Sequence, residues 1–197
     1  MGAKFRSTVT VNDQTFDQIT QVDSLTNWIT TLALPAAKSG TLTTRTSDTV
    51  GVITLPVGHG VPTGTKVGLY WSTGQADADV GTVTGTTIAV TVISGGDNLP
   101  SSSSAITVGR MVETGISMNT DNIKGIAISM SGSGKVAIRS TTDPLFDGQF
   151  SASGIVVWFD GSTFERPFSL SETTDAVQAS TSQTGVDQVA RIVILKD

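Results

Sequence analysis

The sequence predicts an all-β protein: a β-sandwich or barrel body with an inserted small β-barrel and at most one short helix. Thr and other β-branched residues recur along the chain and suit the half-buried face of a sheet. The 21 glycines fall largely between short apolar runs, where they mark turns. Only 15% of the residues are charged, which is too few for a typical disordered composition. These observations together favour folded sheets connected by turns.

The N-terminal part predicts one strand and one helix. Residues 4–11 alternate polar and apolar side chains, as in a strand or an N-terminal arm. The whole segment 1–22 is polar and short of core residues, which is compatible with such an arm. From Ser24 the apolar residues follow helical spacing up to Pro35, which ends the pattern. The residues with this spacing are Leu25, Trp28, Ile29 and Leu32.

A Pro/Ala/Gly stretch at 34–40 predicts a domain boundary. After it, residues 41–112 contain five short predicted strands separated by turns, which suggests a small barrel. Two of these strands form a predicted hairpin about Gly85. The predicted strands are 49–55, 66–71, 79–84, 88–93 and 105–112. We therefore divide the chain into a barrel insert at 41–112 and a discontinuous β body of 1–40 and 113–197.

The C-terminal part predicts further strands. Residues 123–130 and 135–139 alternate and are expected to pair across a turn at 131–134. Asp160-Gly161 predicts a tight hairpin turn between 154–159 and 164–170. The polar stretch 171–185 is expected to be an exposed loop. The apolar run 189–195 predicts a buried last strand, which would pair with an early strand and complete the outer body.

Composition restricts the partners. The net charge is −5 and the few Lys and Arg residues are scattered, so no basic surface for nucleic acid is expected. No apolar run is long enough to cross a membrane, and no signal peptide is recognised. The chain has no cysteine, which removes disulfides and thiolate metal sites.

Catalytic and metal-site patterns are incomplete. His59 is the one histidine, and no nucleophile motif accompanies it, so we expect a turn residue. The stretch 131–135 lacks the first glycine and the final Ser or Thr of a phosphate-binding loop. Asp77 and Asp79 lack the further oxygen ligands of a calcium loop, so we expect solvated loop residues. We expect no enzyme activity, cofactor, metal site or catalytic residue.

Adjacent aromatic residues are candidates for binding surfaces. Tyr70 and Trp71 are neighbours, as are Trp158 and Phe159, so one member of each pair could face solvent if they lie on strands. The alternative is that each pair contacts two packed layers. The candidate interface residues are Phe5, Val9, Val11, Trp28, Tyr70, Trp71 and Trp158.

One segment carries a family resemblance. Its pattern is a loop with His59, Gly60, Gly64 and Val67, then Leu69 to Trp71, then a hairpin with the residues Val83, Gly85, Thr87, Ile88 and Val90. This pattern resembles the small β-barrel module that recurs in structural proteins of tailed bacteriophages. The resemblance covers residues 49–112 and implies a virion protein, synthesised in the host cytoplasm.

The resemblance implies several roles within a virion. The favoured role is a capsid decoration or cement protein, a homo-oligomer with a trimer favoured, which binds the major capsid protein or neighbouring subunits. The first alternative is a tail tube or other tail structural protein, in which the hairpin at 123–139 would help to line a lumen. The second alternative lies outside virions and does not depend on the resemblance: it is a carbohydrate-binding module that uses Tyr70, Trp71 and Trp158.

Overall fold

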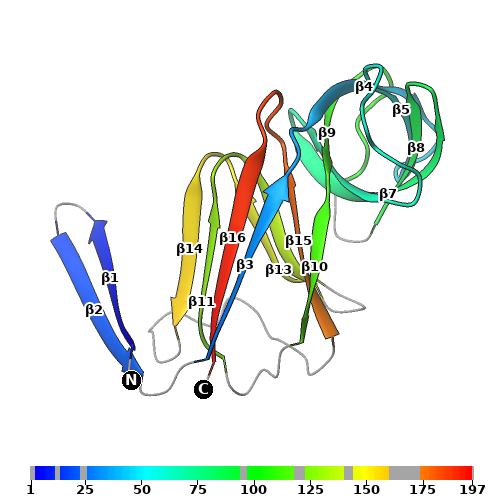
Figure 1. The fold of residues 1–197 in the computed structure, drawn as a ribbon. Coiled ribbons are helices and arrows are strands. Elements are labelled where there is room, and N and C mark those ends of the chain that lie inside the picture. Colours follow the sequence, from blue (N-terminus) through cyan, green and yellow to red (C-terminus); the bar gives the residue numbers. More distant parts are fainter. Residues whose placement is uncertain are drawn as a thin grey trace.

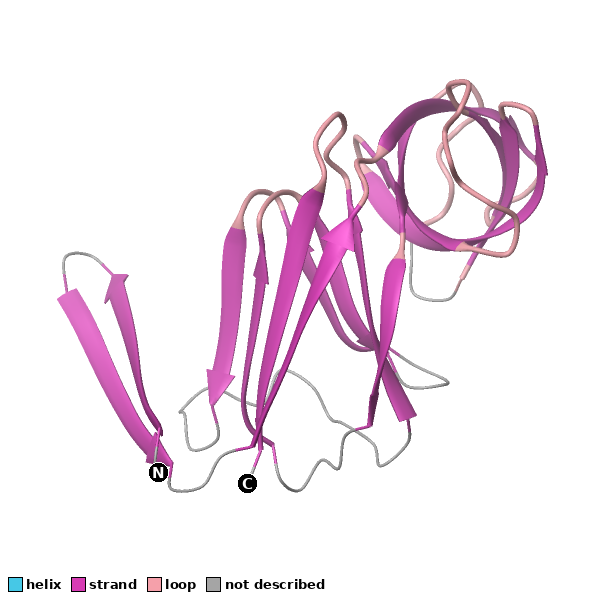
Figure 2. Ribbon diagram, in the orientation of Figure 1, coloured by secondary structure: helices cyan, strands magenta, loops and turns pink. Residues whose placement is uncertain are grey.

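The computed structural model describes residues 3–11, 14–22, 26–93, 97–117, 123–139, 144–159 and 174–196. Every regular element in these ranges is a strand, and together the strands form three open sheets and one closed barrel (Figures 1 and 2). The predicted all-β class is therefore confirmed. The described ranges contain no helix with the length and apolar character that a membrane crossing needs.

The predicted helix around residues 24–32 is wrong. This segment is strand β3, Thr26–Leu34, and it pairs with the last strand, β16, Gln188–Lys196, along their whole lengths. Leu32 and Leu34 are buried, whereas the side chain of Ile29 is 52% exposed. The strand alternation therefore prevails over the helical spacing, because pairing with β16 and the β-branched Thr and Ile residues favour an extended chain.

The barrel consists of six strands in the order β4-β5-β8-β7-β6-β9. One strand more than predicted is present, because β4 begins inside the stretch read as a boundary. Gly85, which has a φ of +57°, provides the turn between β7 and β8, as predicted. The strands are β4 (Lys38–Arg45), β5 (Val50–Thr54), β6 (Lys66–Trp71), β7 (Gly74–Thr84), β8 (Thr87–Val92) and β9 (Ala105–Arg110).

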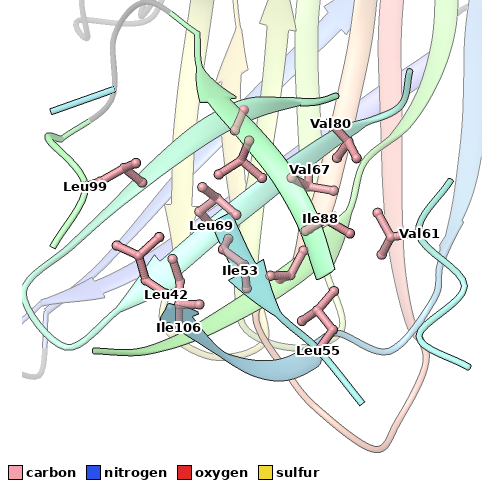
Figure 3. Close-up of a cluster of buried hydrophobic side chains, with 13 residues drawn as sticks. Leu42, Ile53, Leu55, Val61, Val67, Leu69, Val80, Ile88, Leu99 and Ile106 are labelled. Atoms are coloured by element: carbon pink, nitrogen blue, oxygen red, sulfur yellow. The ribbon is translucent and has the colours of Figure 1, made fainter. Parts of the chain in front are cut away.

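Aliphatic side chains fill the barrel (Figure 3). Leu42, Ile53, Leu69 and Ile88 come from four different strands and are fully buried. Alternate residues of each strand point inward, which leaves the intervening residues for the outer surface of the barrel. The core includes Leu42, Ile53, Leu55, Val61, Val67, Leu69, Ala78, Val80, Ile88, Val90, Leu99, Ile106 and Val108.

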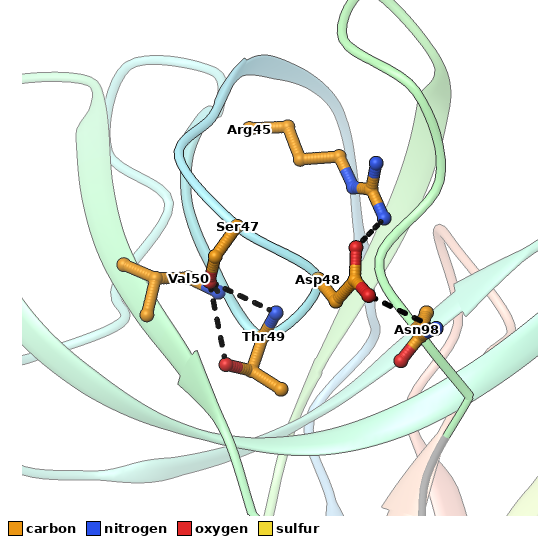
Figure 4. Close-up of polar contacts among 6 residues, drawn as sticks. All are labelled: Arg45, Ser47, Asp48, Thr49, Val50 and Asn98. Carbon is orange, nitrogen blue, oxygen red and sulfur yellow. Dashed lines mark hydrogen bonds and ion pairs between the residues drawn. The ribbon is translucent and has the colours of Figure 1, made fainter.

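Polar contacts close the turn between β4 and β5 (Figure 4). Ser47 Oγ accepts hydrogen bonds from the backbone N–H groups of Thr49 and Val50, at 3.2 and 3.0 Å. Asp48 forms an exposed ion pair with Arg45, and its backbone carbonyl accepts from Leu99 N–H at 2.8 Å. The turn is thereby attached to the loop that leads into β9.

The remaining strands form two four-stranded antiparallel sheets, β14-β11-β16-β3 and β10-β15-β12-β13. β3 is the first strand of these two sheets and pairs with the last, β16; β10 pairs with β15, β11 with β14, and β12 with β13. This nested pairing is the topology of a jelly roll. The strands not yet bounded are β10 (Val112–Ser117), β11 (Ile123–Met130), β12 (Gly134–Arg139), β13 (Pro144–Phe150), β14 (Gly154–Phe159) and β15 (Thr174–Thr181).

The two sheets lie as two layers and enclose a second core (Figure 1). Leu34, Ile128 and Ile192 from one sheet and Val136 and Val177 from the other are almost completely buried. The predicted sandwich body is thus confirmed. β16 also pairs with the early strand β3, as expected. It is not buried on both faces, however, because Val189 and Arg191 are exposed.

Two C-terminal predictions are wrong. β11 and β12 do not form a hairpin, because the turn at 131–134 carries the chain from one sheet to the other. Within 171–185, the expected loop, residues 174–181 form β15, and residues 177–181 are buried. β15 lies between β10 and β12, so its polar residues occupy a central strand. The Asp160-Gly161 turn and the strand predicted at 164–170 lie outside the described residues.

The N-terminal segment forms a separate two-stranded sheet of β1 (Ala3–Val11) and β2 (Gln14–Val22). The hairpin lies beside the sandwich in Figure 1 and pairs with no other described strand. The barrel strands extend from Lys38 to Arg110, whereas the division of the chain into domains at 41 and 112 stays a prediction.

We expect Leu69→Ala to lower the free energy of unfolding of the barrel by about 2–5 kcal/mol, because it leaves a cavity in a fully buried site. Urea unfolding followed by circular dichroism measures this change. Val57→Ala is the matched control, since Val57 is 90% exposed, and it should change stability by less than about 0.5 kcal/mol. Equal effects of the two substitutions would contradict the barrel core described here.

Candidate functional site: the junction of barrel and sandwich

The barrel is inserted into the jelly roll between β3 and β10 by two short links. Residues 35–37 lead from β3 into β4, and Met111 alone separates β9 from β10. The Met111 N–H donates to Lys66 O of β6 at 3.0 Å. On the other link, Ala36 N–H donates to Asp187 Oδ1 at 2.8 Å and Ala37 N–H to Gln183 O at 3.0 Å. Both links are therefore held by hydrogen bonds.

A pair of glycines lets the barrel approach the backbone of the sandwich. Gly68 of β6 and Gly109 of β9 lie directly opposite each other on the outer face of the barrel. A Cβ atom on Gly68 would lie 2.4 Å from Ser180 Oγ, and one on Gly109 would lie 2.0 Å from Thr181 O. No side chain fits in this space. The end of β15 thus packs on a flat surface made by two residues without side chains.

The same end of β15 is confined from its other side. A Cβ on Gly134, the first residue of β12, would lie 2.3 Å from Ser180 O. Thr181 Oγ1 donates to Ser133 O at 2.9 Å, and Ser182 N–H donates to the same carbonyl at 3.1 Å. Ser180 and Thr181 are consequently held between the barrel and the neighbouring strand.

An ion pair joins the two parts next to the glycines. Lys135 Nζ of β12 lies 2.9 Å from Asp77 Oδ2 of β7, and the two side chains are only 6% and 3% exposed. Asp77 is opposite Gly68 in the barrel register, so the glycines and the carboxylate form one row across β9, β6 and β7. The expectation of a solvated loop at Asp77 is wrong, because the residue lies on a strand that faces the sandwich. Asp79 is exposed.

Tyr70 and Trp71 take different positions at this junction. The Tyr70 hydroxyl is 2.7 Å from Ser180 Oγ and also donates to Ser180 O at 3.3 Å. Trp71, the next residue, packs in part against the barrel core. Both side chains are half-buried. The pair thus contacts two layers, as in the alternative considered from the sequence.

A cleft of about 840 Å³ opens beside these aromatic residues, between the barrel and the sandwich. The barrel contributes Tyr70, Trp71 and the turn that follows, and the sandwich contributes the β11–β12 turn and the end of β13. The lining residues are Tyr70, Trp71, Thr73, Gly74, Gln75, Asp97, Ser133, Gly134, Gln149, Phe150, Ser151 and Ser182.

His59 is a buried loop residue. Its Nδ1 accepts a hydrogen bond from Val61 N–H at 3.1 Å, which requires this nitrogen to be unprotonated. Nε2 then carries the proton and donates to Gly85 O at 3.2 Å. The imidazole thereby connects the loop after β5 to the β7–β8 turn. No group of three or more His, Asp or Glu side chains that could hold a metal occurs in the described part of the chain.

The candidate interface residues are distributed over the molecule. The backbones of Phe5, Val9 and Val11 lie on β1, that of Trp28 on β3 and that of Trp158 on β14, while their side chains lie outside the described part. Tyr70 and Trp71 are the candidates that the junction brings together. Their use toward another molecule stays a prediction.

Sequence reasoning missed the residues that hold the junction, namely Gly68, Gly109, Lys135 and Ser180. Gly68 and Gly109 each stand one residue from a buried aliphatic residue of a strand, and an isolated glycine inside a strand indicates close backbone approach. That signal was present in the sequence. The pairing of Lys135 with Asp77 carried no such signal, because the two residues are 58 positions apart.

We expect Lys135→Met to lower the free energy of unfolding by about 3–5 kcal/mol, because it leaves the Asp77 carboxylate buried without its ion pair. Adding Asp77→Leu should restore most of this loss, since two apolar side chains tolerate burial. Arg45→Met is the control, because the exposed Arg45–Asp48 pair contributes less than about 1 kcal/mol. Denaturant unfolding measures all four proteins. A loss no larger than that of Arg45→Met would refute a stabilising role.

We expect Gly109→Ala to displace the barrel from the sandwich while both cores stay folded, because the added methyl overlaps Thr181 O. Residual dipolar couplings measure the relative orientation of the two parts, and proteolysis measures exposure of the links. Gly115→Ala is the matched control, since Gly115 lies on a strand and a Cβ there meets nothing within 4 Å. An unchanged orientation in Gly109→Ala would show that the contact is not tight.

Comparisons with known proteins identify no relative. No protein-family model matches the chain, and a search of curated proteins gives no match.

Proposed function

We propose that this chain is a structural protein of a tailed-bacteriophage virion, and specifically a capsid decoration protein that binds the major capsid lattice. The observation that carries the proposal is that the two ends of the molecule are formed by different parts of the chain. The barrel lies at one end of the jelly roll, and both termini lie at the other (Figure 1). A decoration protein needs such an arrangement, with one end toward the lattice and the other toward solvent.

The N-terminal hairpin supports a role in assembly. β1 and β2 pair with each other and with no other described strand, so the hairpin is available as an arm toward a neighbouring subunit. Two-stranded hairpins are marginally stable alone in water, and packing on a further surface stabilises them. The lattice or a second copy of the chain would provide that surface. A homotrimer is the form that we propose.

The close contacts at the junction also support a structural role. The buried Lys135–Asp77 pair and the glycine contact attach the barrel directly to the jelly roll, as a virion component under mechanical load requires. Jelly rolls recur in viral capsid proteins, but they also occur in lectins and cupins, so the fold is an analogy here. The sequence resemblance of residues 49–112 favours the virion.

The tail tube alternative is less well supported. It relied on a long hairpin at 123–139 to line a lumen, whereas β11 and β12 belong to different sheets. A tube subunit could still use other strands, so particle shape decides between the two roles. Electron microscopy of the purified protein should show discrete oligomers for a decoration protein and stacked rings or tubes for a tail protein.

The direct test is co-expression with the major capsid protein of the same virus, followed by cryo-electron microscopy of the particles. We expect regular added density on the lattice, with the hairpin end inward and the barrel outward. Val9→Asp with Val11→Asp should abolish this density, whereas Val57→Asp, on an exposed barrel loop, should leave it unchanged. Bare particles with the unchanged protein, or tubes of the protein alone, would overturn the proposal.

A further inference from the structure

We propose that the cleft between barrel and sandwich binds a neutral or amino-bearing oligosaccharide. The inference is independent of the virion role, because it depends on the lining of one cleft within a single chain. A cleft of about 840 Å³ lies in the range of sites for small organic ligands and is large enough for a short saccharide.

Aromatic side chains supply the apolar part of the site. Tyr70 and Trp71 line it from the barrel, and Phe150 lines it from the sandwich. The C–H faces of a pyranose ring pack on the negative face of an aromatic ring, which gives such residues affinity for sugars. The Tyr70 ring is held by the hydrogen bonds of its hydroxyl to Ser180, and Trp71 is held by the barrel core. Little entropy is then lost when a sugar binds.

Gly74 shapes the polar wall of the cleft. A Cβ on Gly74 would lie 2.5 Å from Asp97 Oδ2 and 3.0 Å from Trp71 Cζ2. The absence of a side chain there lets a carboxylate and an indole ring approach the same point. Asp97 is further positioned by Gln75 N–H, which donates to its Oδ2 at 2.9 Å. A carboxylate beside an aromatic ring can accept hydrogen bonds from sugar hydroxyls while the ring contacts the C–H face.

The other polar groups suit hydroxyl-rich ligands. Gln75 lines the cleft from the barrel and Gln149 lines it from the sandwich, and a glutamine amide can both donate and accept. Thr73, Ser133, Ser151 and Ser182 add hydroxyl groups. Many polar groups with few apolar ones are unsuited to an apolar ligand, whose binding would leave them without hydrogen bonds.

Charge selects the class of saccharide. Asp97 is the one charged side chain among the described residues that line the cleft. Sulfated and sialylated chains would place their negative groups near this carboxylate without a cation to compensate, which is unfavourable in a partly enclosed site. Neutral chains avoid this cost, and an amino sugar would gain an attraction.

The test is NMR titration of the ¹⁵N-labelled full chain with maltohexaose, cellohexaose and chitosan hexamer, with heparin and polysialic acid as anionic comparators. We expect at least one of the first three to shift the indole N–H signal of Trp71. Trp71→Phe assigns that signal among the three tryptophans. The anionic chains should not shift it.

Variants identify the site and separate it from folding. Asp97→Asn and Gln149→Ala should each weaken the best-bound of the three hexamers about tenfold by calorimetry, because the first replaces a charged acceptor with a weaker neutral one and the second removes an amide. Both residues are exposed, so the fold should be retained. Asp79→Asn is the matched control, since Asp79 is exposed on the barrel outside the cleft, and it should bind normally. Absence of any shift, unaltered binding by both cleft variants, or tighter binding of the anionic chains would overturn the proposal.

Discussion

The structure depends on the close contact between the end of β15 and the glycine pair Gly68–Gly109. Backbone against backbone at this distance requires the absence of two side chains at opposed positions of neighbouring strands. It brings Asp77 in the same row next to Lys135, and it brings the Tyr70 hydroxyl to Ser180. The orientation of the barrel, and the cleft beside it, follow from this contact.

The two interactions at the junction have different physical roles. The glycine contact is short in range and fixes geometry, since a single added methyl would overlap a carbonyl oxygen. The buried ion pair is costly to desolvate, and its net contribution to stability is small compared with the loss on removing one partner. It therefore discriminates against other positions of the barrel, which would leave one buried charge unpaired. Together they attach the insert directly to the jelly roll.

Predictions that relied on neighbouring residues succeeded where pairing is local. The β7–β8 hairpin was predicted because alternating strands flank Gly85, and both strands contribute to one barrel. The pairing of the last strand with an early one was also predicted, but the conformation of two strands whose partners are distant in the sequence was not. The sequence of β3 has helical spacing, and the segment is a strand because it pairs with β16. The sequence of β15 is polar, as in a loop, and the segment is a strand because it pairs with β10 and β12. Gln178 and Ser180 of β15 face outward from the sandwich, so the burial of these two polar side chains depends on contacts with elements outside the sandwich core.

The sequence by itself determined the class of secondary structure, the small barrel and the positions of its turns. These depend on alternation, β-branching and glycine, which act over a few residues. Only the tertiary structure decided that the strands of the body form a jelly roll, that Asp77 is buried against Lys135, and that Trp71, Asp97 and Gln149 line one cleft. Each of these depends on residues far apart in the chain, and the pairing of distant strands has no local pattern from which it can be read.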